Sequence, residues 1–333
     1  MEKKISINEK IFVAGANGMA GKAICRILHK YNYGLEEFQG KILTPSRKDL
    51  NLLDTEAVKN WFKKHKPTVV IIAAARVGGI YANSTQPASF ILDNIKIQTN
   101  LIESSWIFGV KRLLFLGSSC IYPKFSDQPI QEESLLKGSL ESTNENYAIA
   151  KICGIKLCEA LRSQYKFDAI SLMPTNLYGP GDNYHPKYSH VMAALIKRFC
   201  DGTISKFPSI LCWGSGNPLR EFMHVDDLGE AVVFVLENWD PESKNSPKDN
   251  KGNPLTYLNV GTGKEISIRN LSEKIAKAAG FKGDITWDQT KPDGTPRKLL
   301  DTTRINKMGW FSKKSLKEGI DETIKCYYKD NNL

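Results

Sequence analysis

The chain lacks several features that would assign it to other classes of protein. Its seven cysteines are an odd number and include no CxxC pair, which favours free thiols over a disulfide framework or a zinc site. No apolar run approaches the ~20 residues of a membrane span, because the most apolar segment, Val69 to Ala75, ends at Arg76. The first ten residues are polar and basic, so no secretory signal is expected. These absences predict a cytoplasmic protein.

The net charge of +10 comes without an arginine-rich run or an RNA-binding motif, so nucleic-acid binding is not expected. We interpret most lysines as a solvated surface, and a few arginines as a positive field for polyanionic ligands. The chain has 333 residues, of which 41% are hydrophobic and 25% charged. Those values are typical of a globular protein with a well-buried core and two domains.

Strand-like apolar runs alternate with helical patterns through the first half of the chain. The expected strands are Ile11–Ala14, Lys41–Leu43, Thr68–Ala75, Lys111–Leu116 and Ala169–Met173. Helices are expected between them, at about residues 20–30, 54–65, 86–108 and 145–166. This alternation predicts parallel strands joined by crossover helices, which is an α/β fold with a Rossmann-like, doubly wound parallel sheet. Ligands of such folds bind at the carboxyl ends of the strands.

The second domain is predicted to be smaller, discontinuous and substrate-binding. After Gly179–Asp182 the sequence changes to loops, short helices and turns, and the segment from Glu221 to Glu237 resembles a return to the sheet. Another strand and turn are expected at Leu258–Gly263, and Asp240–Asn253 reads as a surface loop. The predicted division is therefore residues 1–177 and 222–262 for the cofactor domain, and 178–221 and 263–333 for the substrate domain.

Three glycines follow the first strand with the spacing GxxGxxG. They are Gly15, Gly18 and Gly21, with Asn17 and Met19 between them. Glycines allow the backbone to turn sharply and to approach a pyrophosphate, whose charge is received by a helix N-terminus. A tight strand–helix turn without a ligand would show the same spacing, so the motif alone is a weak indication.

The second strand indicates which dinucleotide is preferred. NAD enzymes usually end this strand with an acidic residue that binds the ribose 2′-hydroxyl. Here Thr44–Lys48 follows the strand, and no acidic residue occurs before Asp49. We therefore predict NADP(H), with Arg47 and possible help from Ser46 on the 2′-phosphate. An exposed arginine without a ligand is the alternative.

A serine, a tyrosine and a lysine form a candidate set for ketone reduction. Tyr147 and Lys151 are four residues apart and share one helix face. We expect the lysine charge to favour the phenolate of a tyrosine, whose ordinary pKa is about 10. Ser118, at the end of a strand, could hold a carbonyl oxygen while Tyr147 exchanges a proton with it. Such chemistry requires a bound hydride donor.

Several longer motifs carry a resemblance that covers nearly the whole chain. They are Leu116–Pro123, Met173–Pro180, Ser189–Val191, Trp213–Gly216, Arg220–Phe222 and Lys291–Lys298. In these motifs the chain resembles the GDP-L-fucose synthase family, in the nucleotide-sugar branch of the extended short-chain dehydrogenases/reductases. One departure is Ala16-Asn17, where some relatives place a basic residue in the glycine loop.

The resemblance implies an epimerase and reductase. Members of that family epimerise C3 and C5 of GDP-4-keto-6-deoxy-D-mannose and then reduce C4 with NADPH. It implies that Ser118, Tyr147 and Lys151 are the reductase triad and that Cys120 and His190 are the base and acid of epimerisation. The implied contacts to the GDP-sugar are Arg198, Trp213, Arg220 and Asp293. The expected cofactor contacts are Gly15, Asn17, Gly18, Met19, Gly21, Arg47, Ala74, Leu116, Gly117, Ser119, Pro174, Asn176 and Leu177.

The residues support the epimerase role on chemical grounds. Side chains two apart on a strand face the same way, so Cys120 is expected beside Ser118 and near the carbons that flank a bound ketone. A thiolate can remove a proton alpha to a ketone, and His190 titrates in the range needed to return one. The alternatives are that Cys120 is a small buried hydrophobe and that His190 is a loop or helix-start residue.

Other functions remain open at this point. The same chemistry, or one half of it, could act on another GDP-4-keto sugar, such as one leading to colitose or to a 6-deoxy-heptose. A non-enzymatic NADP-binding regulator on the same fold is a second alternative, which loss of Tyr147 or Lys151 would have favoured. The resemblance also suggests a homodimer that associates through the helices at 86–108 and 145–166.

Overall fold

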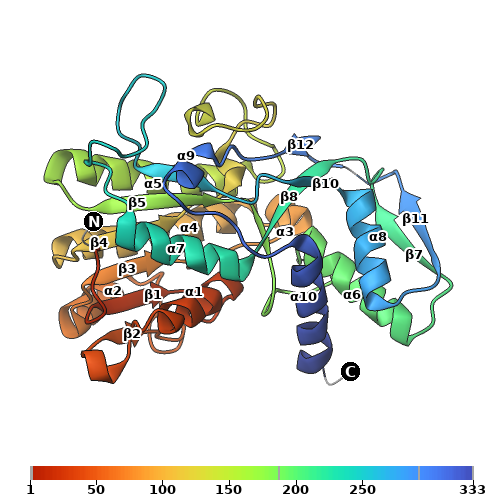
Figure 1. Ribbon diagram of the computed structural model, residues 1–333, viewed down its shortest axis with the longest axis horizontal. Helices are drawn as coiled ribbons and strands as arrows, with labels where there is room; N and C mark the ends of the chain where they lie inside the picture. Colours follow the sequence, from red (N-terminus) through yellow and green to blue (C-terminus); the bar gives the residue numbers. More distant parts are fainter. Residues whose placement is uncertain (1–2, 187, 292, 332–333) are drawn as a thin grey trace.

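The computed structural model describes residues 3–186, 188–291 and 293–331. Pro292, within the motif Lys291–Lys298, lies outside the described residues. Figure 1 shows a larger part built on a central sheet, and a smaller part that carries α6, α8 and α10 beyond one end of that sheet. Among the described residues, no helix is long and apolar enough to span a bilayer.

The central sheet has six parallel strands in the order β2-β1-β3-β4-β5-β9. Their bounds are β1 Lys10–Ala14, β2 Lys41–Leu43, β3 Val69–Ile72, β4 Arg112–Leu116, β5 Ala169–Pro174 and β9 Tyr257–Val260. Phe12 of β1 pairs with Val70 of β3, which pairs with Leu113 of β4. Runs of apolar residues form these strands because both faces of the sheet are covered. The predicted doubly wound α/β fold is confirmed. The third strand is shorter than expected, because residues 73–75 form a loop.

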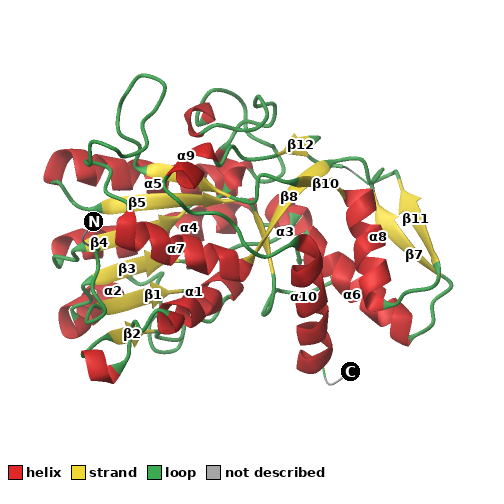
Figure 2. Ribbon diagram, viewed as in Figure 1, coloured by secondary structure: helices red, strands yellow, loops and turns green. Residues whose placement is uncertain are grey.

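Helices cover both faces of this sheet (Figure 2). One face carries α1, Met19–Lys30, and α7, Val225–Asn238. The other carries α2, Thr55–His65, α4, Pro87–Ile107, and α5, Glu145–Tyr165. Each helix buries an apolar stripe against the strands; in α1 this stripe includes Ile24, Ile27 and Leu28. These helices agree with the expected ranges to within two residues at each end.

The smaller part is built around β8, Leu219–His224. This strand pairs in parallel with β6, Asn176–Tyr178, and β12, Arg297–Lys298, and antiparallel with β10, Glu265–Ser267. A parallel pair of β7, Ser209–Trp213, and β11, Asp284–Asp288, lies beside it. The helices of this part are α6, Val191–Ile204, α8, Ile268–Ala279, and α10, Leu316–Asp330. Two short helices elsewhere are α3, Ile80–Thr85, and α9, Thr303–Lys307.

The sequence predicts that residues 221–237 return to the large sheet, and this is correct for the helix but wrong for the strand. Helix α7 does pack on the large sheet, but β8 belongs to the small sheet. Conversely, Ile305 and Trp310 from the C-terminal third pack into the core of the large part. The proposed domain boundaries stay a prediction, and chain segments cross between the two parts near residue 224 and near residue 300.

A buried carboxylate connects the chain segments that cross between the two parts. Glu221 of β8 is fully buried, and its Oε1 accepts the backbone N–H groups of Thr262 at 2.6 Å and Gly263 at 2.7 Å. Its Oε2 accepts the N–H of Leu300 at 3.1 Å. Burial raises the pKa of Glu221, while these three N–H donors lower it. One side chain therefore links β8, the turn after β9 and the segment after β12.

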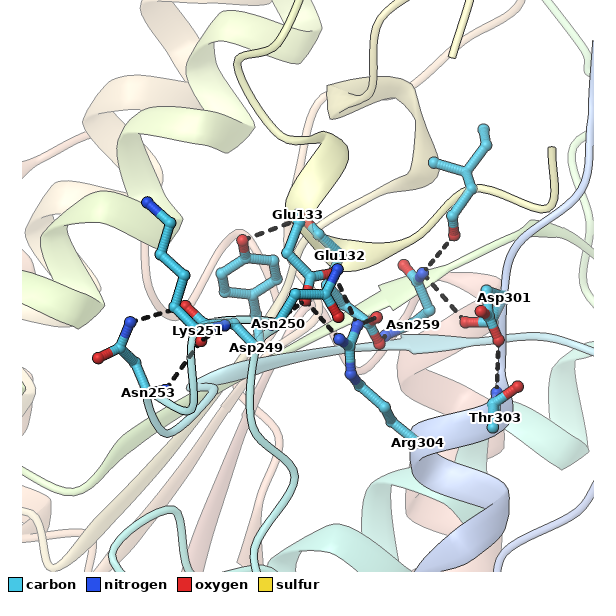
Figure 3. A network of polar contacts seen from close by, with 12 residues as sticks. Glu132, Glu133, Asp249, Asn250, Lys251, Asn253, Asn259, Asp301, Thr303 and Arg304 are labelled. Carbon is cyan, nitrogen blue, oxygen red and sulfur yellow. Dashed lines mark hydrogen bonds and ion pairs between the residues drawn. The ribbon is translucent and has the colours of Figure 1, made fainter. Parts of the chain in front are cut away.

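A second polar network fixes the long excursion between β4 and α5 (Figure 3). Glu132 is 1% exposed and accepts the backbone N–H of Asn259 at 3.0 Å. Arg304 of α9 forms ion pairs with both Glu132 and Glu133. Burial raises the pKa of Glu132, and Arg304 opposes that shift. The excursion is thus tied to β9 and to α9 by charges that are largely out of water.

We expect Arg304→Met to destabilise the protein by about 3 kcal/mol or more, because it leaves the Glu132 carboxylate buried without a cation. Chemical denaturation at pH 8 would measure the loss. The deficit should shrink at pH 5, where the stranded Glu132 can take up a proton. As a control, Lys317→Met removes an exposed pair with Asp321 and should change stability little. Equal effects of the two variants would contradict a structural role for Arg304.

Candidate active site

The site residues predicted from the sequence gather where the strands of the large sheet end. β1, β3, β4 and β5 are parallel neighbours, so their carboxyl ends share one edge of the sheet. Figure 1 shows that the small part lies beyond this edge. The glycine loop, the loop after β3 and the turn that contains Ser118 therefore lie at the edge of the sheet that faces the small part.

The glycine loop has the shape of a phosphate cradle. Gly15 has a φ of 85°, and a Cβ there would lie 2.7 Å from Cα of Ala74. A Cβ on Gly21 would lie 2.1 Å from the carbonyl oxygen of Gly15. Gly18 precedes α1 and provides no side-chain cap, so the first N–H groups of this helix are available to an anion. These residues fit the pyrophosphate of a dinucleotide.

The remaining predicted cofactor contacts line the same edge. Asn17 is exposed and Met19 half-buried at the start of α1. Gly117 packs against the side chain of Met173, because a Cβ at Gly117 would lie only 2.4 Å from the Met173 sulfur. Asn176 donates its amide to the carbonyl of Glu221 at 2.8 Å. The others at this edge are Ala74 after β3, Leu116 and Ser119 around the end of β4, Pro174 at the end of β5 and Leu177 on β6.

In the loop after β2, the two candidate residues for the 2′-phosphate, Ser46 and Arg47, have different surroundings. Ser46 donates its hydroxyl to Oδ2 of Asp49 at 2.7 Å, and its backbone N–H reaches the same oxygen at 2.9 Å. Arg47 is exposed. The serine is therefore already engaged by the carboxylate, and Arg47 is the better-placed group for a phosphate.

The geometry of Ser118 and Cys120 differs from the expected one. β4 ends at Leu116, and Ser119–Ile121 form a turn of 3-10 helix. Ser118 caps this turn, because its Oγ accepts the backbone N–H of Cys120 at 3.2 Å. Strand alternation therefore does not place Cys120 beside Ser118, because the strand has already ended and the chain turns over the Ser118 cap. The turn still keeps Ser118 and Cys120 close together.

Tyr147 and Lys151 lie on α5 as predicted, but burial controls their charge. Lys151 is 3% exposed, and burial lowers its pKa to about 7. Its Nζ donates to the carbonyl of Leu116 at 2.8 Å and lies 5.9 Å from the centroid of the Tyr147 ring. Burial raises the pKa of Tyr147, Cys120 raises it further, and a hydrogen bond with Ser118 lowers it. The expected preference for the phenolate is not found, and Tyr147 is held as the neutral phenol.

Two groups that the sequence did not single out contact the thiol of Cys120. Asn144 Nδ2 lies 3.5 Å from Sγ, and Lys298 Nζ lies 3.6 Å from it. A small pocket beside the thiol is also lined by Lys124, Glu141 and Arg297. Lys298 lies within the motif Lys291–Lys298, but no spacing rule relates it to a cysteine 178 residues away.

His190 immediately precedes α6, as the alternative interpretation of this residue expected. The residue as a whole is exposed, but burial around its imidazole lowers the pKa of His190. Its segment packs on the loop after β3, where Gly79 N–H donates to the carbonyl of Tyr188 at 3.1 Å. Among the described residues, no hydrogen bond joins the imidazole to Cys120. A role for His190 as an acid stays a prediction.

The four predicted substrate contacts form one charged, aromatic surface. The Arg198 guanidinium lies 5.2 Å from the centroid of the Trp213 ring, and Lys291 Nζ lies 5.9 Å from the same ring. Arg220 donates to the carbonyl of Asp293 at 3.4 Å. Trp213 is 54% exposed. Cations around an open aromatic face suit an anionic ligand with a flat base.

Asp293 itself is turned toward the protein. Its carboxylate accepts the backbone N–H and the hydroxyl of Ser215, both at 2.8 Å. Gly214 has a φ of 79°, and a Cβ there would lie 2.3 Å from Oδ1 of Asp293. This carboxylate orders the turn that follows Trp213, so its contact with a ligand stays a prediction.

The glycine cradle and the Ser–Tyr–Lys set define a dinucleotide-dependent enzyme of the epimerase and dehydratase class. The chain matches the model of the NAD dependent epimerase/dehydratase family over residues 11–247 and belongs to that family. It is 49% identical to GDP-L-fucose synthase 1 of Arabidopsis thaliana over 96% of this chain and 94% of that protein. It is 46% identical to the GDP-L-fucose synthase of Escherichia coli over 97% and 98%. Within its class, the chain belongs to the GDP-L-fucose synthase family.

Relatives named for other substrates, and one GDP-L-fucose synthetase of known structure, are less similar to the chain in sequence. The GDP-L-colitose synthase of Yersinia pseudotuberculosis is 36% identical over 97% of this chain and 99% of that protein. A solved GDP-6-OMe-4-keto-L-xylo-heptose reductase of C. jejuni superposes with a TM-score of 0.89 at 32% identity, covering 98% and 99%. A GDP-L-fucose synthetase of Naegleria fowleri solved with NADP gives a TM-score of 0.85 at 26% identity, covering 100% and 98%.

The depressed pKa of Lys151 predicts a pH-dependent stability. An unfolded lysine titrates near 10.4, whereas the folded one titrates at about 7. The unfolded state therefore binds more protons between these values, and stability rises with pH across that window. We expect Lys151→Met to raise the Tm of the ligand-free protein by roughly 2–4 °C at pH 6. The gain should vanish toward pH 10, and a pH-independent difference in Tm would contradict the assignment.

Proposed function

We propose that this chain catalyses the NADPH-dependent conversion of GDP-4-keto-6-deoxy-D-mannose to GDP-L-fucose. One observation carries the proposal: at the end of β4, Ser118 Oγ accepts the backbone N–H of Cys120 at 3.2 Å, and both Ser118 and Cys120 act on the pKa of the Tyr147 phenol. A base for epimerisation thus lies beside an acid for reduction. The GDP-L-fucose synthases at 46–49% identity support this substrate over that of the GDP-L-colitose synthase at 36% and that of the heptose synthase at 30%.

The cofactor of this proposal is NADP(H). When bound, it supplies the hydride that reduces C4. Gly15, Gly18 and Gly21 would admit its pyrophosphate, and Arg47 would pair with its 2′-phosphate. Lys151 is fixed beside the end of β4 by the carbonyl of Leu116, where its ammonium would donate to a bound ribose.

The reductase half uses Ser118 and Tyr147. The Ser118 hydroxyl would hold the C4 carbonyl oxygen, and Tyr147 would give that oxygen a proton as the C4 carbon is reduced. The raised pKa of Tyr147 keeps this proton in place at neutral pH. A protonated Lys151, whose Nζ lies 5.9 Å from the centroid of the Tyr147 ring, would favour release of this proton to the substrate.

The epimerase half uses Cys120 and His190. Protons on C3 and C5 are acidic because they lie alpha to the C4 ketone. The Cys120 thiolate would remove such a proton, leaving an enolate whose oxygen is stabilised by Ser118 and Tyr147. His190 would return a proton to the opposite face. The GDP moiety would lie over Arg198, Trp213 and Arg220, with Asp293 ordering their surroundings.

We also propose a cytoplasmic homodimer. All seven cysteines are free, which suits a reducing compartment. The outer surface of α4 exposes Leu92 by 52% and Ile107 by 51%, and α5 exposes Cys153 beside it. Pairing of α4 and α5 with a second copy would cover these groups, and light scattering would give the mass.

The cofactor preference predicts a specific defect in Arg47→Ala. Because a charge-assisted hydrogen bond to phosphate is worth about 1.5–3 kcal/mol, the KM for NADPH should rise roughly tenfold or more. The KM for NADH should not change, which makes NADH the internal control. Comparable kcat/KM for the two cofactors in the wild type, or an unchanged KM for NADPH in the variant, would refute the assignment.

The two halves of the chemistry should separate in deuterium oxide. Without NADPH, the wild type should exchange deuterium into C3 and C5 of GDP-4-keto-6-deoxy-D-mannose, as followed by NMR. Cys120→Ser should lose most of that exchange, because a hydroxyl is far less acidic than a thiol with an ordinary pKa of about 8.5. His190→Asn should slow epimerisation roughly a hundredfold.

The reductase variant gives the complementary result. With NADPH, the wild type should yield GDP-L-fucose, whereas Tyr147→Phe should bind NADPH but form almost no product. Cys120→Ser should still reduce a ketone that is already epimerised. Failure of the wild type to exchange deuterium would make it a simple reductase, and the absence of any product would favour the NADP-binding regulator. Turnover only of a colitose or heptose precursor would support the other alternative.

A further inference from the structure

Two side chains donate hydrogen bonds to the sulfur of Cys120. Asn144, which precedes α5, donates at 3.5 Å, and Lys298 donates from β12 at 3.6 Å. A thiol sulfur is only a weak acceptor of such bonds, whereas a thiolate accepts charge-assisted ones. Both donors therefore favour the charged form of the sulfur, which is the form that removes protons.

The backbone of both donors is held by regular secondary structure. Lys298 lies opposite Arg220 in the β12–β8 strand pair, and the next residue, Leu299, donates its N–H to the Gln128 side chain at 2.9 Å. Asn144 is the N-terminal cap of α5, a helix of 21 residues. Its position places the sulfur near the positive end of that helix, which also stabilises negative charge.

The other charged groups near the thiol do not replace Lys298. Lys124 and Arg297 line the same pocket, but Lys124 pairs with Glu141 at 2.8 Å and Arg297 pairs with Glu265 at 2.8 Å. Arg220 and Tyr147 also act on Cys120 electrostatically. Across the described ranges, no carboxylate lies within 4.0 Å of the Lys298 ammonium, so its charge is directed at the sulfur.

We propose that Lys298 is the positioning residue that maintains Cys120 as a thiolate, with Asn144 as the second donor. The catalytic meaning of this assignment rests on the proposed function. In each epimerisation the sulfur takes a proton from carbon and becomes a thiol, and the electron pair of the broken C–H bond goes to the enolate. The thiol must then lose its proton to solvent before the next removal, and the Lys298 charge favours that loss.

The test is the pH dependence of alkylation by iodoacetamide, measured without substrate or cofactor. Cys120 is partly exposed, and peptide mapping separates it from the other six cysteines. We expect Lys298→Met to move the midpoint of the Cys120 rate profile upward by about one pH unit or more. Alkylation at pH 7 should then be roughly tenfold slower than in the wild type.

Two variants control for structural effects. Lys298→Arg keeps the positive charge and should restore most of the wild-type profile. Lys124→Met removes a lysine from the same pocket and should leave the profile unchanged. A Lys298→Met profile that superimposes on the wild type would overturn the proposal, as would equal shifts in Lys298→Met and Lys124→Met.

This readout is independent of the reaction. If the alkylation profile shifts as expected but deuterium exchange is absent, the role of Lys298 stands and the proposed function fails. If exchange is present in both the wild type and Lys298→Met at equal rates and the profiles coincide, the proposed function stands and Lys298 has no such role.

Discussion

The buried carboxylate of Glu221 is the constraint on which the geometry of the candidate site depends. It binds three backbone N–H groups, two from the turn after β9 in the large sheet and one from the segment after β12. Neighbouring residues of a strand point to opposite sides, so fixing Glu221 inward directs Arg220 toward the candidate site. The same anchoring sets the register of β12 against β8, and with it the position of Lys298.

Desolvation dominates the electrostatics of the site. Burial favours the neutral forms of both Tyr147 and Lys151, because a charge loses its hydration in the interior. At Cys120, by contrast, an ammonium and an amide donate hydrogen bonds to the sulfur. Tyr147 and Cys120 therefore have different surroundings within the same site.

Much of the fold and part of the site could be predicted from the sequence, for identifiable reasons. The βα alternation is local, so its periodicity places the strands and helices to within a few residues. The glycine spacing reports a backbone requirement that Gly15 and Gly21 meet by close contact with Ala74 and with each other. The small sheet was missed because β8 pairs with β6, β10 and β12, which are distant in sequence. The contact of Lys298 with Cys120 is long-range in the same way. The charge states of Tyr147 and Lys151 depend on burial, which i,i+4 spacing does not report.

Epimerisation and reduction at one ketone place opposite demands on the side chains around it. Proton removal needs a base that is already ionised, whereas reduction needs an acid that has kept its proton. Groups whose environments drive their protonation states apart can serve both steps from one position. Tyr147 keeps its proton because it is buried and lies beside Cys120, both of which raise its pKa. Cys120 faces the cations of the small part instead. The junction that joins the two parts therefore also gives Tyr147 and Cys120 different electrostatic surroundings.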